Sequence, residues 1–348
     1  MKIMVTGNLG YVGPSVILQL RQSYPSAYLV GMDLGFFAHC LTGVKVSPES
    51  ILDLQIYKDV RDVTRADFEG FDAVVHLAAV SNDPMGKTFA RVTNEINCQS
   101  SLKIADLAKS AGIKNYVFAS SCSVYGEATE FAKKEGDELN PLTAYAKSKI
   151  DTEIGLMGLA ANQFVVTCLR FGTACGFSPR TRLDLVLNDF VAGAIANGVI
   201  SILSDGTPWR PLIHVSDMAR AIDWAVSREG NNGGSMLVIN VGSDEWNYQV
   251  NDLAVVVAKE IPGTKVDINP NATPDKRSYR VDFTKFRELA PNYQPQISLI
   301  EAVRGLRDGL QRMDFSNGDF KSSNLIRLNV LNSLIGSNIL TDNLTWIK

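Results

Sequence analysis

Short apolar segments alternate with amphipathic segments along the first half of the chain. The apolar segments, which predict buried strands, are 2–7, 27–33, 72–80, 115–121 and 164–172. The segments whose apolar residues recur at helical spacing are 10–24, 90–112 and 143–160. Apolar strands that alternate with helices are typical of a parallel sheet covered on both faces. The pattern therefore predicts the α/β class, with a Rossmann-like doubly wound parallel sheet over residues 1–172.

The alternation becomes irregular after residue 172. Proline and glycine become frequent, as in CGFSPRTRLD and LSDGTPWRPLIH, and helices and strands interleave less regularly. We expect a smaller mixed α/β lobe over residues 173–311, with a return to the first lobe around 211–242. The C-terminal extension, residues 312–348, is polar at first and then carries spaced apolar residues. That spacing predicts a helix that packs on the body of the protein or on a second subunit.

Composition narrows the class of protein. The chain has 348 residues, a formal charge of −3 and no long basic block, which argues against nucleic acid as a partner. Its five cysteines form no CxxC pair, and its three histidines are far apart, so reduced thiols and no metal site are expected. The N-terminus lacks the apolar stretch of a signal peptide, and no run of about twenty apolar residues could span a membrane. A cytoplasmic protein is the expectation.

A glycine-rich segment, TGNLGYVG, lies between the first expected strand and the first expected helix. Its glycines are Gly7, Gly10 and Gly13. Glycine permits a sharp turn and close approach of the backbone to a pyrophosphate, and the helix that follows offers N–H groups. A tight turn without any ligand would also use glycines, so this segment alone is weak evidence. Tyr11 and Val12 of the same loop are included among the expected cofactor contacts.

An acidic residue ends the second expected strand, which strengthens the case for a dinucleotide. Asp33 follows Gly13 by twenty residues. A carboxylate there can bind both hydroxyls of the adenine ribose and would repel a 2′-phosphate. The residues that follow, LGFFAHCL, supply no arginine or lysine for that phosphate. We therefore predict NAD rather than NADP, although a turn or cap residue is the simpler alternative for Asp33 taken singly.

Two further segments complete the expected cofactor site. Asp59 and Val60, in YKDVRD after a third expected strand, could meet the adenine, although a solvated loop acid fits the spacing nearly as well. Leu77, Ala78 and Ala79 lie at the end of the expected strand over 72–80. Their small apolar side chains would let the cofactor lie against the backbone, or they could equally belong to the core.

The candidate catalytic residues are a tyrosine and a lysine four residues apart, Tyr145 and Lys149. On a helix this spacing places them on one face, where an ammonium can lower a phenol pKa from its usual value of about 10. Alone, the pair is more simply a helix surface. However, SSCSVYG follows the fifth expected strand, and ligands bind beyond the carboxyl ends of such strands. Ser121, and secondarily Ser123, would therefore lie near the cofactor with Tyr145.

These segments together resemble the extended short-chain dehydrogenases/reductases, in the NAD-dependent sugar epimerase/dehydratase group that includes UDP-glucose 4-epimerase-like proteins. The matching segments, in family order over about residues 1–310, are TGNLGYVG, Asp33, HLAA, NEIN, SSCSVYG, YAKSK, LRFGTACG and RPLIHVSDMARAI. The resemblance implies that Ser121, Tyr145 and Lys149 are catalytic and that Asn97 of NEIN belongs to the cofactor site. It also implies a nucleoside-diphosphate sugar in the second lobe and a homodimer built on segments 90–112 and 143–160.

One departure from the family pattern limits the reaction. Dehydratases of the group carry an Asp-Glu pair directly after the position of Ser121, whereas this chain has Cys122 and Ser123. The expected activity is therefore a 4-epimerase, in which Tyr145 takes the O4 proton, C4 passes hydride to NAD, and hydride returns to the other face of the 4-keto sugar. A 4-dehydrogenase or 4-ketoreductase would use the same residues. A catalytically silent NAD-sensing protein is the alternative from a different class.

A diphosphate requires cations, and arginine offers a planar fork of donors. Arg210 matches a family position that contacts phosphate, while each other arginine could simply be a surface residue. The expected substrate-binding residues are Asn82, Met85, Ser121, Ser123, Thr173, Arg180, Arg182, Asn188, Arg210, Arg277 and Arg280.

Overall fold

The central element of the computed structural model is a sheet of seven parallel strands, in the order β10-β6-β5-β4-β1-β2-β3. The structure describes residues 1–81, 83–127, 131–269, 272 and 275–347. The strands are β1 (Lys2–Thr6), β2 (Tyr28–Asp33), β3 (Leu54–Tyr57), β4 (Ala73–His76), β5 (Asn115–Ser121), β6 (Val165–Phe171) and β10 (Met236–Val241). The Rossmann-like α/β fold predicted from the sequence is thus confirmed.

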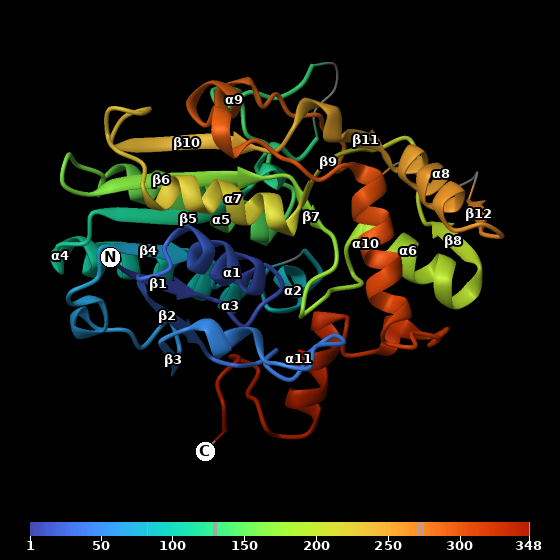
Figure 1. Ribbon diagram of the computed structural model, residues 1–348, viewed down its shortest axis with the longest axis horizontal. Helices are drawn as coiled ribbons and strands as arrows, with labels where there is room; N and C mark the ends of the chain where they lie inside the picture. The colour runs from blue at the N-terminus through green and yellow to red at the C-terminus, as the bar shows by residue number, and fades with distance from the viewer. Residues whose placement is uncertain (82, 128–130, 270–271, 273–274, 348) are drawn as a thin grey trace.

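Helices cover both faces of this sheet (Figure 1). They include α1 (Gly13–Ser23) and α7 (Val215–Val226) on one face, and α4 (Ser100–Ser110) and α5 (Ala144–Met157) on the other. Two short helices, α2 (Asp83–Thr88) and α3 (Ala90–Asn94), precede α4, and α9 (Thr284–Leu289) packs near β10. Because apolar side chains of the strands point to both faces, each face has its own buried cluster.

The segment 90–112, expected as one helix, is interrupted. A π-helical stretch, Glu95–Gln99, separates α3 from α4. Its Asn97 accepts a hydrogen bond from the Val80 N–H at 2.8 Å and donates to the Val80 carbonyl at 3.0 Å. A widened turn of this kind is frequent near functional sites. Here it lets one buried amide side chain fix the loop that follows β4.

The second lobe is smaller and mixed. Its strands form a three-stranded sheet, β11-β9-β7, and a two-stranded sheet, β12-β8. The elements are β7 (Thr173–Cys175), α6 (Val186–Asn197), β8 (Val199–Ile202), β9 (Trp209–His214), β11 (Asn247–Gln249), α8 (Val250–Glu260), β12 (Lys265–Ile268) and α10 (Leu299–Gln311). A separate apolar cluster from α6, α8 and α10 holds this lobe together.

The C-terminal extension contains the expected helix, α11 (Arg327–Gly336), and packs on the body of its own chain. Leu331, Leu340 and Leu344 are at most 2% exposed and belong to the same apolar cluster as the first lobe. In Figure 1 the extension lies beside the end of the sheet formed by β2 and β3. None of the helices within the described ranges is long and apolar enough to cross a membrane.

Candidate active site

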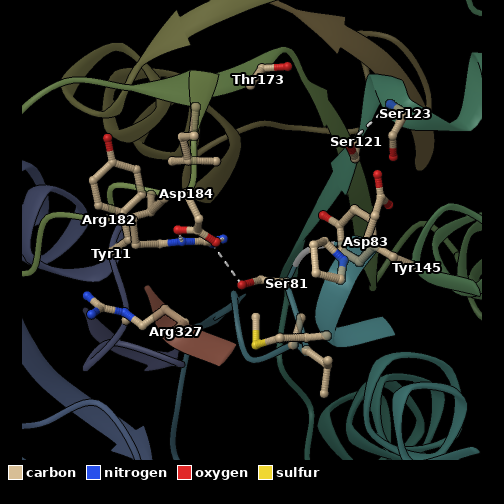
Figure 2. A pocket seen from close by; sticks show the side chains of 18 of the residues that line it. Tyr11, Ser81, Asp83, Ser121, Ser123, Tyr145, Thr173, Arg182, Asp184 and Arg327 are labelled. Atoms are coloured by element: carbon tan, nitrogen blue, oxygen red, sulfur yellow. Dashed lines mark hydrogen bonds and ion pairs between the residues drawn. The ribbon is translucent and has the colours of Figure 1, made fainter. Parts of the chain in front are cut away.

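A cavity of about 900 Å³ opens at the carboxyl ends of the parallel strands. Its walls come from the β1–α1 loop, the loops after β2, β3 and β4, the end of β5, the start of α5, the second lobe and the C-terminal extension. Figure 2 shows side chains of these segments facing one another across it. In open α/β sheets this edge is where ligands bind.

The glycine loop forms one wall of the cavity and has no room for side chains. A Cβ atom on Gly7, whose φ is +76°, would lie 2.5 Å from the Ala78 nitrogen, and one on Gly13 would lie 2.1 Å from the Asn8 carbonyl oxygen. Gly7, Gly10, Gly13, Tyr11 and Val12 all line the cavity. α1 begins at Gly13, and no side chain of the described residues caps it. Pro14 has no N–H, and the Ser15 N–H donates to the Val12 carbonyl at 3.1 Å, so any anion at this helix start depends on N–H groups of the loop up to Gly13.

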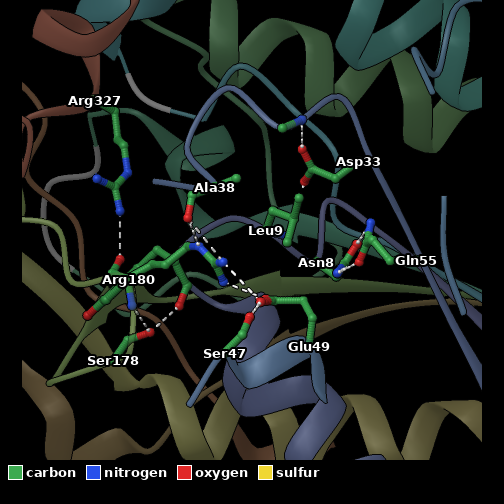
Figure 3. A network of polar contacts seen from close by, with 12 residues as sticks. Asn8, Leu9, Asp33, Ala38, Ser47, Glu49, Gln55, Ser178, Arg180 and Arg327 are labelled. Carbon is green, nitrogen blue, oxygen red and sulfur yellow. Dashed lines mark hydrogen bonds and ion pairs between the residues drawn. The ribbon is translucent and has the colours of Figure 1, made fainter. Parts of the chain in front are cut away.

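Asp33 lies at the end of β2 and lines the same half of the cavity. Its two carboxylate oxygens accept hydrogen bonds from the Gly35 N–H at 2.7 Å and the Leu9 N–H at 3.1 Å (Figure 3). Burial raises the pKa of Asp33, and the two N–H bonds oppose that increase. The carboxylate is therefore oriented by the glycine loop, through Leu9, and by the segment after β2, through Gly35. Its remaining lone pairs could accept from hydroxyl groups of a ligand.

The other residues expected at the cofactor are also at this end. Asp59, Val60, Leu77, Ala78 and Ala79 line the cavity. Asp59 is ion-paired with Arg61 at 2.6 Å, and Lys58 is ion-paired with Asp67 at 2.7 Å. Asn97 does not itself line the cavity in the described structure; it acts on the site by holding Val80.

The three expected catalytic residues meet in the middle of the cavity. Ser121 ends β5, and Tyr145 and Lys149 lie in the first turns of α5, whose N-terminus Thr143 caps through the Ala146 N–H at 3.1 Å. The Lys149 ammonium donates to the Ala119 carbonyl at 2.7 Å and lies 5.5 Å from the centre of the Tyr145 ring. All three side chains line the cavity.

The electrostatics of this group differ from the expectation in one respect. Burial, and secondarily the carboxylate of Asp83, raise the pKa of Tyr145 to about 12, although a hydrogen bond with Ser121 and the charge of Arg182 oppose the increase. Burial also lowers the pKa of Lys149 to about 8, against the charge of Glu153. The predicted lowering of the Tyr145 pKa is thus wrong for the protein's own residues, because desolvation penalises the phenolate more than neighbouring cations favour it.

Arg210 and Arg277 of the second lobe line the cavity, and each is paired with a carboxylate. Arg210 contacts Asp275 at 2.9 Å, and Arg277 contacts Asp275 at 2.6 Å and Asp83 at 2.8 Å. Asp83 also accepts a hydrogen bond from Thr143 at 2.8 Å. The Asp83 and Asp275 carboxylates were missed from the sequence, where each looks like an ordinary loop acid; in the structure Asp83 lies beside Tyr145 (Figure 2).

Arg182 lies in the middle of the cavity rather than at its substrate end. It forms a two-pronged ion pair with Asp184, at 2.7 Å and 3.0 Å, and donates to the Ser81 hydroxyl at 3.0 Å. Its charge acts on both Tyr11 and Tyr145, so the guanidinium stands between the glycine loop and the catalytic tyrosine. Arg182 therefore faces both the glycine loop and Tyr145.

Three of the remaining residues that were expected to bind substrate, Met85, Ser123 and Thr173, line the cavity. Within the part of the chain that the structure describes, the buried Ser123 hydroxyl oxygen has no hydrogen-bond partner. Such a hydroxyl is suited to a ligand, because burial without a partner is costly.

Of the predicted substrate-binding residues that the structure describes, Arg180, Asn188 and Arg280 do not line the cavity. Arg180 is buried against Glu49, with 3.0 Å between Nη2 and Oε2, and donates to the Ala38 carbonyl (Figure 3). Asn188 donates to the Tyr11 hydroxyl at 3.0 Å, and the Arg280 guanidinium covers the Trp209 ring at 5.2 Å. The structure thus gives these three residues packing and bracing contacts. Asn82 lies outside the described residues.

A dinucleotide-binding sheet with a Ser–Tyr–Lys set at its carboxyl edge defines the extended short-chain dehydrogenase/reductase class. A family model described as "NAD dependent epimerase/dehydratase family" matches residues 3–242, and the chain belongs to that family. The family is NAD-dependent, in agreement with the cofactor predicted from the sequence.

Individual relatives carry out several reactions. The chain is 27% identical to UDP-glucuronic acid decarboxylase 1 of Arabidopsis thaliana, over 91% of this chain and 70% of that protein. It is 26% identical to UDP-glucose 4-epimerase of Mycolicibacterium smegmatis, over 87% and 96%. Its fold matches that of MoeE5 in complex with UDP-glucose and NAD, with a TM-score of 0.75, 24% identity and coverage of 90% and 99%. These relatives support NAD-dependent modification of nucleotide sugars.

Proposed function

We propose that this protein is an NAD-dependent nucleotide-sugar epimerase that oxidises C4 of the sugar transiently, with Tyr145 as the acid and base. The observation that carries the proposal is the position of Ser121, Tyr145 and Lys149 in one cavity, between the glycine loop and the two arginines of the second lobe. The similarity to a 4-epimerase over nearly its whole length supports the same reading.

The residues of the first lobe suit NAD. The glycine loop leaves backbone N–H groups where a pyrophosphate would approach, and Asp33 offers lone pairs to ribose hydroxyls. When bound, NAD supplies the acceptor and later the donor of the hydride at C4. The Lys149 ammonium, next to this position, is able to bond the nicotinamide ribose as well as to favour the phenolate of Tyr145.

Each catalytic side chain then has a defined task. Tyr145, as phenolate, takes the proton from O4 while C4 loses hydride, and Ser121 holds the oxygen that becomes a carbonyl. With a pKa raised to about 12, Tyr145 needs positive charge close by to act at neutral pH. Lys149 and the oxidised cofactor are the sources of that charge. Turning of the 4-keto sugar before hydride returns yields the epimer.

The second lobe would hold the nucleotide diphosphate. Arg210 and Arg277 present planar guanidinium groups at the cavity, where phosphate oxygens can replace the carboxylates of Asp275 and Asp83. Met85 and Thr173 would border the sugar. Ser123 adds a hydroxyl without a partner in the described structure.

The residues after Ser121 argue against a 4,6-dehydratase. The thiol of Cys122 is fully buried and donates to the Arg170 carbonyl at 3.1 Å. Burial raises the pKa of Cys122. A thiol that is bonded elsewhere and remains protonated cannot take the place of the acidic pair that removes water from a hexose.

The test begins with denaturing purified protein and identifying the nucleotide that is released. Uridine, thymidine and guanosine diphosphate sugars are then incubated singly with the enzyme, and products are separated by chromatography. We expect one pair of C4 epimers to interconvert without net NADH, and Tyr145→Phe to abolish this. Stoichiometric NADH would establish a 4-dehydrogenase instead, and release of CO₂ from a glucuronic acid substrate would establish a decarboxylase.

A further inference from the structure

The C-terminal extension lies against the half of the cavity that is expected to hold the adenosine of NAD. Five residues of the extension line the cavity: Lys321, Ile326, Arg327, Leu331 and Leu344. The cavity lining also includes Asp33, Asp59 and Val60. The family model matches residues 3–242 and does not reach this part of the chain. The contacts of the extension concentrate on two segments of the first lobe.

The first of these segments directly follows Asp33. The Trp346 indole N–H donates to the Leu34 carbonyl at 2.9 Å, and the indole ring lies 5.3 Å from the ring of Phe36. The Arg327 guanidinium lies 5.2 Å from the centre of the Phe37 ring. The extension therefore contacts the loop that directly follows Asp33, the carboxylate expected to bind the ribose.

The second segment directly follows Asp59 and Val60. Arg61 is ion-paired with Asp59 and donates to the Asn343 and Leu344 carbonyls, each at 2.7 Å. One guanidinium thus connects the acid expected at the adenine to the end of the chain. Both loops that border an adenosine in this fold are held by residues 327–347.

Leu331 and Leu344 of the extension both pack on the first lobe and line the cavity. They are 2% and 1% exposed, and they pack in the apolar cluster that includes Val60 and Met32. Leu344 has a φ of +52°, in the left-handed region that non-glycine residues seldom adopt. The turn is held by the Thr341 N–H, which donates to the Thr345 carbonyl at 2.9 Å. Packing alone would bury these leucines inside the cluster, whereas both also line the cavity.

We propose that Leu331 and Leu344 form one wall of the adenine-binding site, so that the C-terminal extension is part of the cofactor site. Aliphatic side chains suit the flat apolar faces of a purine, and specificity is left to the polar groups of Asp33 and Asp59. This inference rests on the proposed NAD dependence for the identity of its ligand, and it concerns only the adenosine half. The site for the substrate's nucleotide lies at Arg210 and Arg277, in the other half of the cavity.

Titration calorimetry with ADP-ribose and with UDP tests the two halves separately, using the folded full-length chain after any bound nucleotide has been removed. We expect Leu344→Ala to weaken ADP-ribose binding roughly tenfold and to leave UDP binding unchanged, because truncation removes contact with one ligand only. Ile339→Ala is the matched control, since Ile339 belongs to the same extension and is 46% exposed. A folded Leu344→Ala protein with unchanged ADP-ribose affinity, or with equal loss for both ligands, overturns the proposal.

Hydrogen exchange on the unmodified protein tests the same proposal without any risk of misfolding. ADP-ribose is expected to slow amide exchange in residues 339–347 several-fold, whereas UDP is not. Protection by UDP alone, or by neither ligand when ADP-ribose is shown to bind, contradicts the proposal. If the unmodified chain binds no ADP-ribose, the NAD-dependent function and this inference both fail; if it binds but catalyses no epimerisation, only the proposed reaction fails.

Discussion

The Lys149 ammonium stands 5.5 Å from the centre of the Tyr145 ring while its hydrogen bond goes to the Ala119 carbonyl. The lysine is therefore fixed by the end of β5 rather than by the tyrosine. Its charge is at a constant position beside the phenol, and burial lowers its own pKa to about 8. The group that we propose to favour the phenolate thus loses its charge close to neutral pH.

The first prediction concerns this loss of charge. Since Lys149 is cationic below its pKa, we expect the activity of the unmodified enzyme to fall as pH rises through about 8. Arginine stays charged, so Lys149→Arg should lose this alkaline decline even if its rate is roughly tenfold lower. Lys149→Met should lose activity by about a hundredfold or more at every pH. A pH–rate profile measures all three, and an unchanged alkaline limb in Lys149→Arg would contradict the assignment.

The second prediction concerns Asp83, whose negative charge helps to raise the pKa of Tyr145. We expect the rate to rise with pH as Tyr145 loses its proton. Asp83→Asn removes the negative charge, so it should lower the pKa of Tyr145 and move this rise in the pH–rate profile toward lower pH. Asp275→Asn is the control, because it removes the other carboxylate that binds Arg277. Ultraviolet titration of tyrosinate in the two variants gives an independent reading. Equal shifts in both variants would show that Arg277, rather than Asp83, controls the tyrosine.

The third prediction concerns the buried ion pair next to β5, the strand that ends at Ser121. Glu153 and Arg170 are 2% and 5% exposed, contact each other at 2.7 Å, and Glu153 also accepts from Ser120 at 2.5 Å. Glu153→Gln should lower the free energy of unfolding by about 3 kcal/mol, because it leaves a buried guanidinium unpaired. The exposed pair of Arg65 and Glu69 is the control, and Glu69→Gln should cost less than about 1 kcal/mol. Denaturant titration that finds similar losses would refute the role of burial.

The fourth prediction concerns His76 at the end of β4. The Ser101 hydroxyl donates to the Asn97 carbonyl, so it accepts from Nε2 of His76 at 2.8 Å, and Nδ1 accepts from Thr6 at 2.7 Å. Burial lowers the pKa of this neutral imidazole to about 3. The unfolded chain, with a histidine pKa of about 6.5, then binds the extra proton between these values. Stability should therefore fall as pH drops from about 6.5 toward 3, by up to about 5 kcal/mol.

Denaturation at several pH values measures this effect. In His76→Gln the unfolding free energy should depend less on pH over the same range, because the titrating group is gone. Replacing the exposed His39 with glutamine should leave the dependence of the unmodified protein intact. Identical pH dependence in the His76 variant would show that carboxylates alone cause the acid sensitivity.

The first lobe could be predicted because short segments of the sequence suffice to predict most of its strands, helices and loops. Most of its strands are single apolar runs, with β3 the exception. The alternation of strands and helices itself places the glycine loop, Asp33, Ser121 and Tyr145 at one sheet edge. Arg180 and Arg182 show where such reasoning ends. They are two residues apart and chemically identical, yet one binds Glu49, 131 residues away, and the other binds Asp184 in the cavity. Only the folded chain decides which arginine faces a ligand.

The C-terminal extension and the carboxylates of Asp83 and Asp275 show the same limit of prediction from sequence. The apolar spacing of residues 325–335 indicated a helix, but nothing in the spacing indicates which surface it covers. Asp83 and Asp275 resemble any loop acids until Arg277 joins them across the cavity. Likewise, the pKa of Tyr145 depends on how deeply the phenol is buried, and a tyrosine–lysine spacing carries no information about burial.

The pairing of Arg210 and Arg277 with two aspartates also sets a threshold for occupancy. An arriving anion must displace carboxylates that already satisfy both cations. Arg210 and Arg277 contact the same Oδ2 atom of Asp275, at 2.9 Å and 2.6 Å, so a phosphate group in its place could engage both guanidinium groups at once. Filling this end of the cavity would therefore release the Asp275 carboxylate, and the strength of these ion pairs would be subtracted from the affinity for any anion that enters.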